Sequence, residues 1–288
     1  MELIIYGIVN SISLILMSIG FALAYGVSRI PNFAHGSLYI LTGYFTWLFL
    51  NRAGLPYSVA VILSLIIIAL IGAALYQLIL IRVRGMPISE IIASFGVGIA
   101  ILELLRWAGL RGMAYMLPPF IDGTIQIFHV PLSYQRLIII VAGLAMLFFL
   151  WYFTHYTKAG LALRAIAQNE RAALVLGIDS DKAATVAVSL GAVLAGLAGV
   201  LLLPLGNIIV EVGYEVLIFA IAVSVCGGLG SWKGAVMASF LLGFAQIITV
   251  TYIATHYHFV VALVVIIIVL VFRPSGLFGK QKELEERV

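Results

Sequence analysis

Two stretches of this chain are almost continuously aliphatic: ILSLIIIALIGAAL at 62–75 and FVVALVVIIIVLVF at 259–272. A hydrocarbon core of about 30 Å is crossed by about 20 helical residues, and apolar runs of roughly that length recur along the chain. A membrane β-barrel would instead show segments of about 10 residues in which apolar and polar side chains alternate. The aliphatic stretches therefore predict an α-helical membrane protein.

The overall composition agrees with this class. Of the 288 residues, 64% are hydrophobic and 10% are charged, whereas ordinary soluble domains have roughly 45–50% and about 25%. The formal net charge is +4, but no basic patch with interleaved aromatic residues lies outside the apolar runs, so nucleic acid is not an expected partner. We expect an all-α integral membrane protein with a single domain over 1–288, because no linker or long polar block interrupts it.

The apolar runs predict a polytopic bundle of eight or nine membrane-spanning helices, some of them broken or re-entrant. The nine expected spans are 3–28, 33–50, 57–81, 88–108, 136–154, 183–204, 214–230, 234–254 and 257–272.

The distribution of lysine and arginine predicts the orientation of these spans. With nine spans, twelve of the 16 Lys and Arg residues fall on one side of the membrane. The four on the other side are Arg52, Arg106, Arg111 and Arg136. Short cytoplasmic loops carry the positive excess, so we expect the N-terminus outside, and the segment 157–182 and the tail 279–288 in the cytoplasm. An even number of spans would break this pattern.

The segment 157–182, TKAGLALRAIAQNERAALVLGIDSDK, is the most polar stretch between the spans. Residues 162–176 lack proline and glycine and predict one helix, with Gly160 before it and Gly177 ending it. On that helix Arg164, Gln168 and Arg171 would share one face. A second, small and apolar face would contain Ala162, Ala165, Ile166, Asn169, Ala172, Ala173 and Leu176. Such a helix could dock into a groove of another protein or be a solvated loop helix.

Two glycine- or proline-rich breaks lead into helices: GVSRIPNFAHGSLYILTGY at 26–44 and SVCGGLGSWKGAVMASFLL at 224–242. In transporters, interrupted segments at corresponding positions of two halves often line the substrate path. The candidate path residues are Asn32, His35, Gly36, Gly228, Gly230 and Gly234. Asn32 and His35 could instead satisfy backbone groups freed by the break. We expect Gly36 and Gly234 to resist bulky substitution.

Other polar residues near the spans have structural interpretations. Glu103 and Arg106 are three residues apart on one helix and should neutralise each other near the outer end. Glu211 and Glu215, expected in an outer loop, could contact an extracytoplasmic binding protein or be solvated.

The sequence predicts neither an enzyme nor a cofactor site. It lacks an H-E-x-x-H motif and a G-x-S-x-G elbow. His256 and His258 are too close in sequence for a helical metal pair, and Cys226 is the single cysteine, so no metal site is expected. The glycine-rich GGLGSWKG at 227–234 departs from the phosphate-binding pattern, because Gly234 replaces the required serine or threonine.

Three blocks of sequence carry a resemblance to a known family. They are GIVNSISLILMSIGFALAYGVSRIPNFAHGSLYILTGY (7–44), GLALRAIAQNERAALVLGI (160–178) with LGAVLAGLAGVLL (190–202), and VCGGLGSWKGAVMASFLLG (225–243). The chain resembles the permease subunits of branched-chain amino acid ABC importers, specifically the shorter of their two permease types. The N-F-A-H-G and R-A-I-A-Q-N-E blocks are fairly specific in combination.

The resemblance implies a plasma-membrane permease with a second, longer permease, two ATPase subunits that bind ATP, and an extracytoplasmic substrate-binding protein. It implies that a cytoplasmic helix couples the permease to the ATPases, through Gly160, Arg164, Ala165, Asn169, Glu170, Arg171, Ala172 and Gly177. The E-A-A signature of other importers is not preserved here. Because the resemblance gives this helix the coupling role, replacing Glu170 or Arg171 should abolish transport.

The substrates implied by default are leucine, isoleucine and valine. Similar permeases move urea, short amides or other amino acids, and the binding protein largely sets the choice. A secondary transporter or channel is the alternative class, but it would usually carry ionisable coupling residues at mid-membrane, and this sequence has almost none there.

Overall fold

The helices of the protein coincide with the predicted spans to within a few residues. The computed structural model describes residues 1–110 and 115–279. Its long helices are α1 (Glu2–Ser28), α2 (His35–Asn51), α3 (Tyr57–Ala74), α5 (Pro87–Leu105), α6 (Tyr134–Tyr156), α9 (Ser180–Leu202), α10 (Val210–Gly227), α11 (Trp232–Tyr252) and α12 (His258–Phe272). Shorter helical segments are η1 (Leu75–Leu80), α4 (Ile81–Val83), η2 (Arg106–Leu110), α7 (Lys158–Gln168), α8 (Glu170–Val175), η3 (Leu203–Leu205) and η4 (Thr255–Tyr257).

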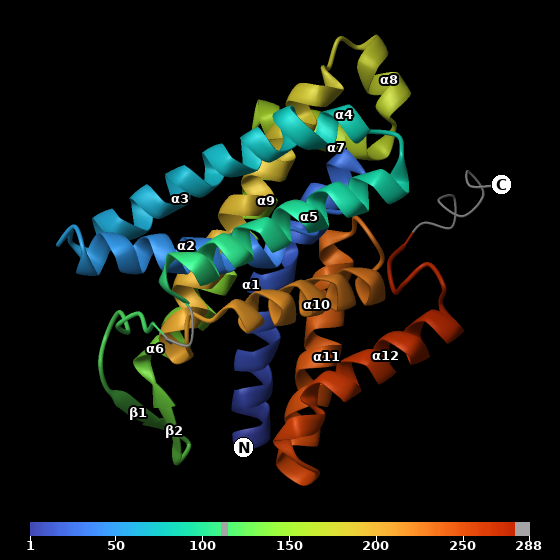
Figure 1. Ribbon diagram of the computed structural model, residues 1–288. Helices are drawn as coiled ribbons and strands as arrows, with labels where there is room; N and C mark the ends of the chain where they lie inside the picture. Colours follow the sequence, from blue (N-terminus) through green and yellow to red (C-terminus); the bar gives the residue numbers. More distant parts are fainter. Residues whose placement is uncertain (111–114, 280–288) are drawn as a thin grey trace.

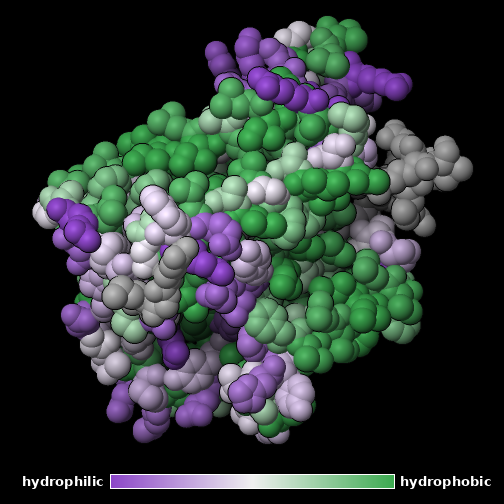
Figure 2. All heavy atoms as spheres, in the orientation of Figure 1, coloured by the Kyte–Doolittle hydropathy of each residue, from purple (hydrophilic) through white to green (hydrophobic). Residues whose placement is uncertain are grey.

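Within the described residues, eight helical stretches are long and apolar enough to cross a membrane. The segment predicted as a further span, 33–50, forms α2, which has 17 residues and is shorter than those eight. The predicted all-α, polytopic membrane fold is therefore confirmed. Figure 2 shows the corresponding hydrophobic surface between two hydrophilic ends.

Helices α1 and α9 cross at the centre of the bundle, and the other long helices surround them (Figure 1). Small residues allow the two central helices to approach closely. A β-carbon on Gly20 would lie 2.6 Å from the Gly191 carbonyl oxygen, and one on Gly191 would lie 2.7 Å from the Gly20 carbonyl oxygen. The close packing of these helices therefore depends on glycine at both positions.

The segment between α5 and α6 contains regular structure that the sequence did not predict. It contains a short antiparallel hairpin of β1 (Thr124–Ile127) and β2 (Val130–Ser133). The buried Gln135 holds this segment to the bundle: its amide nitrogen donates to the Leu201 carbonyl oxygen (2.7 Å), and its amide oxygen accepts from the Phe120 N–H (3.1 Å). Backbone pairing and this amide supply the hydrogen bonds that order the segment.

The two ends of the bundle carry different elements. The α7–α8 end carries α4, α7 and α8, and the hairpin end carries β1, β2 and the N-terminus (Figure 1). Arg111 and most of the charged tail 279–288, to which the sequence assigned opposite sides of the membrane, lie outside the described residues.

Candidate functional site

The polar segment 157–182 folds into two short helices rather than one. Asn169 is extended (φ −157°, ψ 102°) and separates α7 from α8. Its side-chain oxygen accepts a hydrogen bond from the Ala172 N–H at 3.0 Å, so Asn169 caps α8. The prediction of a single helix was wrong, because the capping preference of Asn169 outweighs the helix propensity of its neighbours. Arg164 and Arg171 consequently belong to different helices.

The ends of α7 and α8 follow from specific residues. Thr157 caps α7 by accepting from the Gly160 N–H at 3.0 Å. The prediction that Gly160 precedes the helix was wrong: Gly160 lies inside α7, where a β-carbon would lie 2.0 Å from the Phe153 carbonyl oxygen. Gly177 ends α8 with a φ of 80°, and the Ile178 N–H donates to the Ala173 carbonyl oxygen at 3.0 Å. The predicted stop at Gly177 is thus confirmed.

Apolar contacts attach α7 and α8 to the ends of the central helices. Leu163 and Ile166 of α7 and Ala173 of α8 are buried against Val27 of α1 and against α9. Arg164 and Ala165 are half-buried, whereas Asn169, Arg171 and Ala172 are exposed. The residues that the resemblance assigned to ATPase coupling therefore divide between the contact with the bundle and the free surface.

A polar cluster of five residues also ties α8 to the membrane helices: Tyr76, Arg84, Glu170, Ser180 and Asp181. Arg84 donates to Glu170 Oε1 (2.6 Å) and to Ser180 Oγ (2.7 Å), and also contacts the Asp181 carboxylate. Ser180 Oγ donates to Glu170 Oε1 at 2.6 Å, and the Tyr76 hydroxyl donates to Asp181 at 3.0 Å. The cluster links η1 and α4 to α8 and α9.

Electrostatics keep the centre of this cluster charged. Burial alone lowers the pKa of Arg84, but the neighbouring Tyr76, Glu170 and Asp181 oppose this effect and raise the pKa above its ordinary value. Sequence reasoning counted Arg84 only toward membrane orientation and missed Tyr76, Ser180 and Asp181. No spacing rule links these residues, because Arg84 and Glu170 are 86 positions apart.

An exposed apolar patch covers the outside of α8. Leu174, Val175 and Leu176 are 50%, 88% and 79% exposed, respectively. They lie at the hydrophilic α7–α8 end rather than within the hydrophobic surface (Figures 1 and 2). Contiguous exposed apolar side chains in such a polar setting are a candidate surface for contact with another protein.

The first break, between α1 and α2, is partly buried and is supported by several hydrogen bonds. Asn32 accepts from the Ala34 N–H at 3.1 Å, and His35 Nε2 donates to the Met17 carbonyl oxygen at 2.8 Å. Ser94 of α5, which sequence reasoning missed, accepts from the Phe33 N–H at 3.2 Å. Its single hydroxyl proton can be donated to the Pro31 carbonyl oxygen (3.2 Å) or to the nearer Glu90 carbonyl oxygen of its own helix (2.9 Å). Irregular backbone inside a membrane needs such partners.

Replacing Ser94 with alanine is expected to destabilise this break. The half-buried Phe33 N–H would lose its hydrogen-bond acceptor, and an unsatisfied buried group costs roughly 1–3 kcal/mol. The thermal unfolding midpoint of the purified protein in detergent should fall. Ser89→Ala, on the same helix but only half-buried, is the matched control. Equal midpoints for both variants would contradict the supporting role of Ser94.

The glycines of the two breaks approach different helices. A β-carbon on Gly36 would lie 1.9 Å from the Gly213 carbonyl oxygen of α10, and one on Gly234 would lie 1.9 Å from the Gly227 carbonyl oxygen. Gly228 and Gly230 have φ of 97° and 83°, and a β-carbon on Gly230 would lie 3.0 Å from the α-carbon of Gly26. The structure thus places Gly36 against α10, Gly228 and Gly230 in the turn between α10 and α11, and Gly234 in the first turn of α11.

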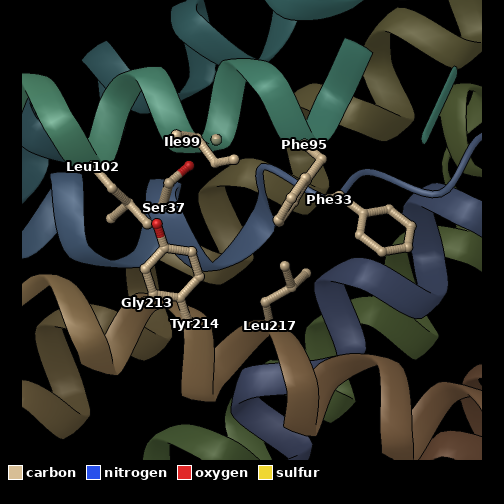
Figure 3. A pocket seen from close by; sticks show the side chains of 9 residues that line it. Phe33, Ser37, Phe95, Ile99, Leu102, Gly213, Tyr214 and Leu217 are labelled. Atoms are coloured by element: carbon tan, nitrogen blue, oxygen red, sulfur yellow. The ribbon is translucent and has the colours of Figure 1, made fainter. Parts of the chain in front are cut away.

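A cleft opens between the start of α2, α5 and α10 (Figure 3). Its lining residues are Phe33, Ser37, Phe95, Gly98, Ile99, Leu102, Gly213, Tyr214 and Leu217. Phe33 and Ser37 line the cleft, whereas Asn32, His35 and Gly36 of the same segment do not. Asn32 bonds within the break, His35 bonds to α1, and Gly36 packs against α10. The break that the sequence singled out therefore contributes one wall of the cleft.

A group of charged residues lies beyond the cleft at the hairpin end, and we call Glu103, Arg106 and Glu211 the charged rim. Arg106 is 3.7 Å from the Glu103 carboxylate, as the spacing predicts, and 3.5 Å from the Glu211 carboxylate. Glu211 and Glu215 belong to the first turns of α10 rather than to a loop, since α10 begins at Val210. The rim thus joins the facing ends of α5 and α10.

Comparison with known proteins identifies the family of this chain. The model of the family described as "Branched-chain amino acid transport system / permease component" matches residues 3–270. The chain belongs to this family. The match covers the polar segment, both breaks and all three helices that form the cleft, so it concerns the whole membrane bundle.

Individual relatives agree over most of their length. The chain is 30% identical to the high-affinity branched-chain amino acid transport system permease protein LivH of Salmonella typhimurium, over 92% of this chain and 91% of the relative. It is 29% identical to the corresponding protein BraD of Pseudomonas aeruginosa, with the same coverage. Among solved structures, PsaBC from Streptococcus pneumoniae in complex with Fab matches with a TM-score of 0.53 and 14% identity, over 100% of this chain and 96% of that chain. This last likeness shows the fold.

The protein is therefore a multi-pass membrane permease of this family. No group of three or more histidine, cysteine, aspartate or glutamate side chains within the described residues is arranged to hold a metal ion. Cys226 is buried among apolar side chains.

Proposed function

We propose that this chain is a permease subunit of an ATP-driven importer of branched-chain amino acids in the plasma membrane. A second, longer permease completes the translocation path, two separate ATPase subunits bind ATP, and an extracytoplasmic binding protein delivers the substrate. The family match over 3–270 supports the transport role, and the names of the relatives support leucine, isoleucine and valine as substrates.

The observation that carries the proposal is the construction of the α7–α8 end. Two short helices project from the bundle, expose the apolar patch Leu174–Leu176, and are anchored underneath by Glu170 and the rest of the polar cluster. A surface of this kind transmits movement from an ATPase to the membrane helices, because force on the patch acts directly on α4 and α9. In this proposal the α7–α8 end faces the cytoplasm and the hairpin end faces outward.

A pull-down tests the assembly. The tagged chain is extracted from its native membrane in mild detergent, and mass spectrometry identifies its partners. Recovery of ATPase subunits together with a longer permease is the expected result. Recovery of the chain alone, or only as a homo-oligomer, would refute the importer and favour a secondary transporter or channel.

Replacing Val175 with aspartate should abolish ATPase binding. The substitution places a charge in the middle of the apolar patch, where it would have to be desolvated in the interface. ATPase recovery in the pull-down is expected to fall at least tenfold while the level of permease in the membrane stays normal. Ile121→Asp, which adds the same charge to an exposed apolar residue outside the patch, between α5 and β1, is the control. Undiminished ATPase recovery with Val175→Asp would exclude the patch as the docking surface.

A further inference from the structure

One turn of the third membrane helix is wound as a π-helix rather than an α-helix. This turn, η1, interrupts the helical stretch Tyr57–Val83 between α3 and α4, close to the α7–α8 end (Figure 1). The Ile81 N–H at its end donates to the Tyr76 carbonyl oxygen, five residues earlier instead of four. A π-turn thus holds one more residue than an α-helical turn, and such turns are rare and occur frequently at functional sites.

The π-winding places three buried side chains on one face of the helix: Leu75, Tyr76 and Leu80. Successive residues of an α-helix are about 100° apart, so Leu80 would lie about 140° around the helix from Leu75. In a π-helix, whose hydrogen bonds join residues five apart, Leu80 follows Leu75 on the same side. The three side chains pack with α9 and with Ile30 and Ala34, which flank the first break. The face that η1 creates therefore touches this break.

The short helix after η1 also reaches the polar cluster. Arg84 lies four residues after Leu80, at the end of this helix, and donates to Glu170 of α8 at 2.6 Å. Leu80 thus packs beside the first break while Arg84 holds α8. A rotation of this helix changes both contacts at once.

The helix is fixed before η1 and free after it. The Ser189 hydroxyl of α9 donates to the Ala69 carbonyl oxygen at 2.7 Å, and a β-carbon on Gly72 would lie 2.7 Å from a side chain of α9. The Tyr76 hydroxyl donates to α9 as well. At the other end, Gly85 has a φ of 86°, and no heavy atom lies within 4 Å of the position of its β-carbon. The extra residue of the π-turn can therefore shift only toward Gly85.

Building on the proposed function, we propose that η1 passes the movement of α8 to the first break by changing from π- to α-winding. In the present state the π-turn keeps Leu80 at the break and Arg84 on Glu170. When the ATPase subunits move α8, the extra residue shifts toward Gly85, and the helix beyond Tyr76 turns by about 100°, the angle of one residue. Leu80 then leaves the break as Arg84 leaves Glu170, so the two ends of the helix respond together.

Deleting Gln77 tests this role, because it removes the extra residue but no buried side chain. Leu80 then follows Leu75 by four residues and Tyr76 by three, which is one face of an ordinary α-helix. The variant should keep its present contacts and lose the ability to turn. Leucine uptake by the complete importer in proteoliposomes should fall at least tenfold, while the ATPase subunits remain bound in the pull-down.

Gln77→Ala is the matched control, since it removes the same side chain and keeps the length of the π-turn. Its uptake should equal that of the unmodified chain. Normal uptake after deletion of Gln77 would overturn the proposal.

A distance measurement on a chain of full length avoids dependence on the folding of the deletion variant. Spin labels are attached to Arg82→Cys on α4 and Val186→Cys on α9, both at exposed positions, whereas the native Cys226 is buried. Trapping the importer with ATP and hydrolysis-deficient ATPases should change the label separation by several ångströms. The upper bound is roughly 8 Å, because a helix with its side chains is about 10–12 Å wide and turns by about 100°.

The control pair is Ile62→Cys with Val186→Cys, because Ile62 is exposed on α3 before the π-turn. Its separation should stay constant. An unchanged separation between positions 82 and 186, or an equal change in both pairs, would overturn the proposal. If the unmodified importer takes up no leucine, the proposed function fails instead, so the two failures are distinguishable.

Discussion

Replacing Gly36 with leucine is expected to remove most of the folded permease from the membrane. A β-carbon at this position would lie 1.9 Å from the Gly213 carbonyl oxygen. That oxygen belongs to the backbone of α10, so it cannot rotate away as a side chain could. Overpacking a core costs about 1–3 kcal/mol and occasionally more, and here helix α2 or α10 must move. The monodisperse fraction in size-exclusion chromatography should fall at least tenfold.

Gly96→Leu provides the matched control for this substitution. Gly96 lies on α5, where a β-carbon would have no heavy atom within 4 Å, so the larger side chain has room. This variant should keep the monodisperse fraction and the uptake of the unmodified chain. Gly234→Leu should behave like Gly36→Leu, because its β-carbon would also lie 1.9 Å from a backbone oxygen. Normal folding and uptake by both Gly36→Leu and Gly234→Leu would disprove the close approach.

Replacing Glu170 with alanine is expected to uncouple ATP hydrolysis from transport. The change removes the carboxylate that binds both Arg84 and Ser180, at 2.6 Å each. Helix α8 then loses its polar attachment to α4 and α9, while the apolar patch stays intact. ATPase subunits should remain bound in the pull-down, but amino acid uptake should fall at least tenfold. Retained ATPase binding together with lost uptake would separate the transmission of movement from the docking of the ATPases, since Val175→Asp should instead release the ATPases.

Lys182→Ala is the control for removing a charge at the same end of the molecule. Lys182 forms a 3.2 Å ion pair with Asp179 in which its own side chain is 85% exposed, and such pairs contribute little. Uptake should therefore remain near that of the unmodified chain. A double-mutant cycle with Arg84→Met and Glu170→Met adds a direct measure of the pair. Additive effects on uptake would show that Arg84 and Glu170 act independently and would refute the role of the polar cluster.

The individual predictions from sequence differ in outcome for identifiable reasons. The stop at Gly177 was predictable, because a left-handed terminal residue is a local preference of glycine. The separation of α7 from α8 at Asn169 was also a local signal, but it was underweighted against the helix propensity of the surrounding alanines and leucines. The hairpin β1–β2 was missed, since two strands of four residues each give too short a pattern to outweigh loop composition.

The sequence by itself determined the membrane class, the approximate bounds of the spans, the two breaks and the polar segment, because these depend on hydrophobicity and backbone preferences within a few neighbouring residues. Only the tertiary structure decided the partners across the chain. It placed Arg84 against Glu170, Ser94 against the break at Pro31, and Arg106 beside Glu211. Such contacts join residues far apart in sequence through helix packing, and no local periodicity encodes which helix faces meet.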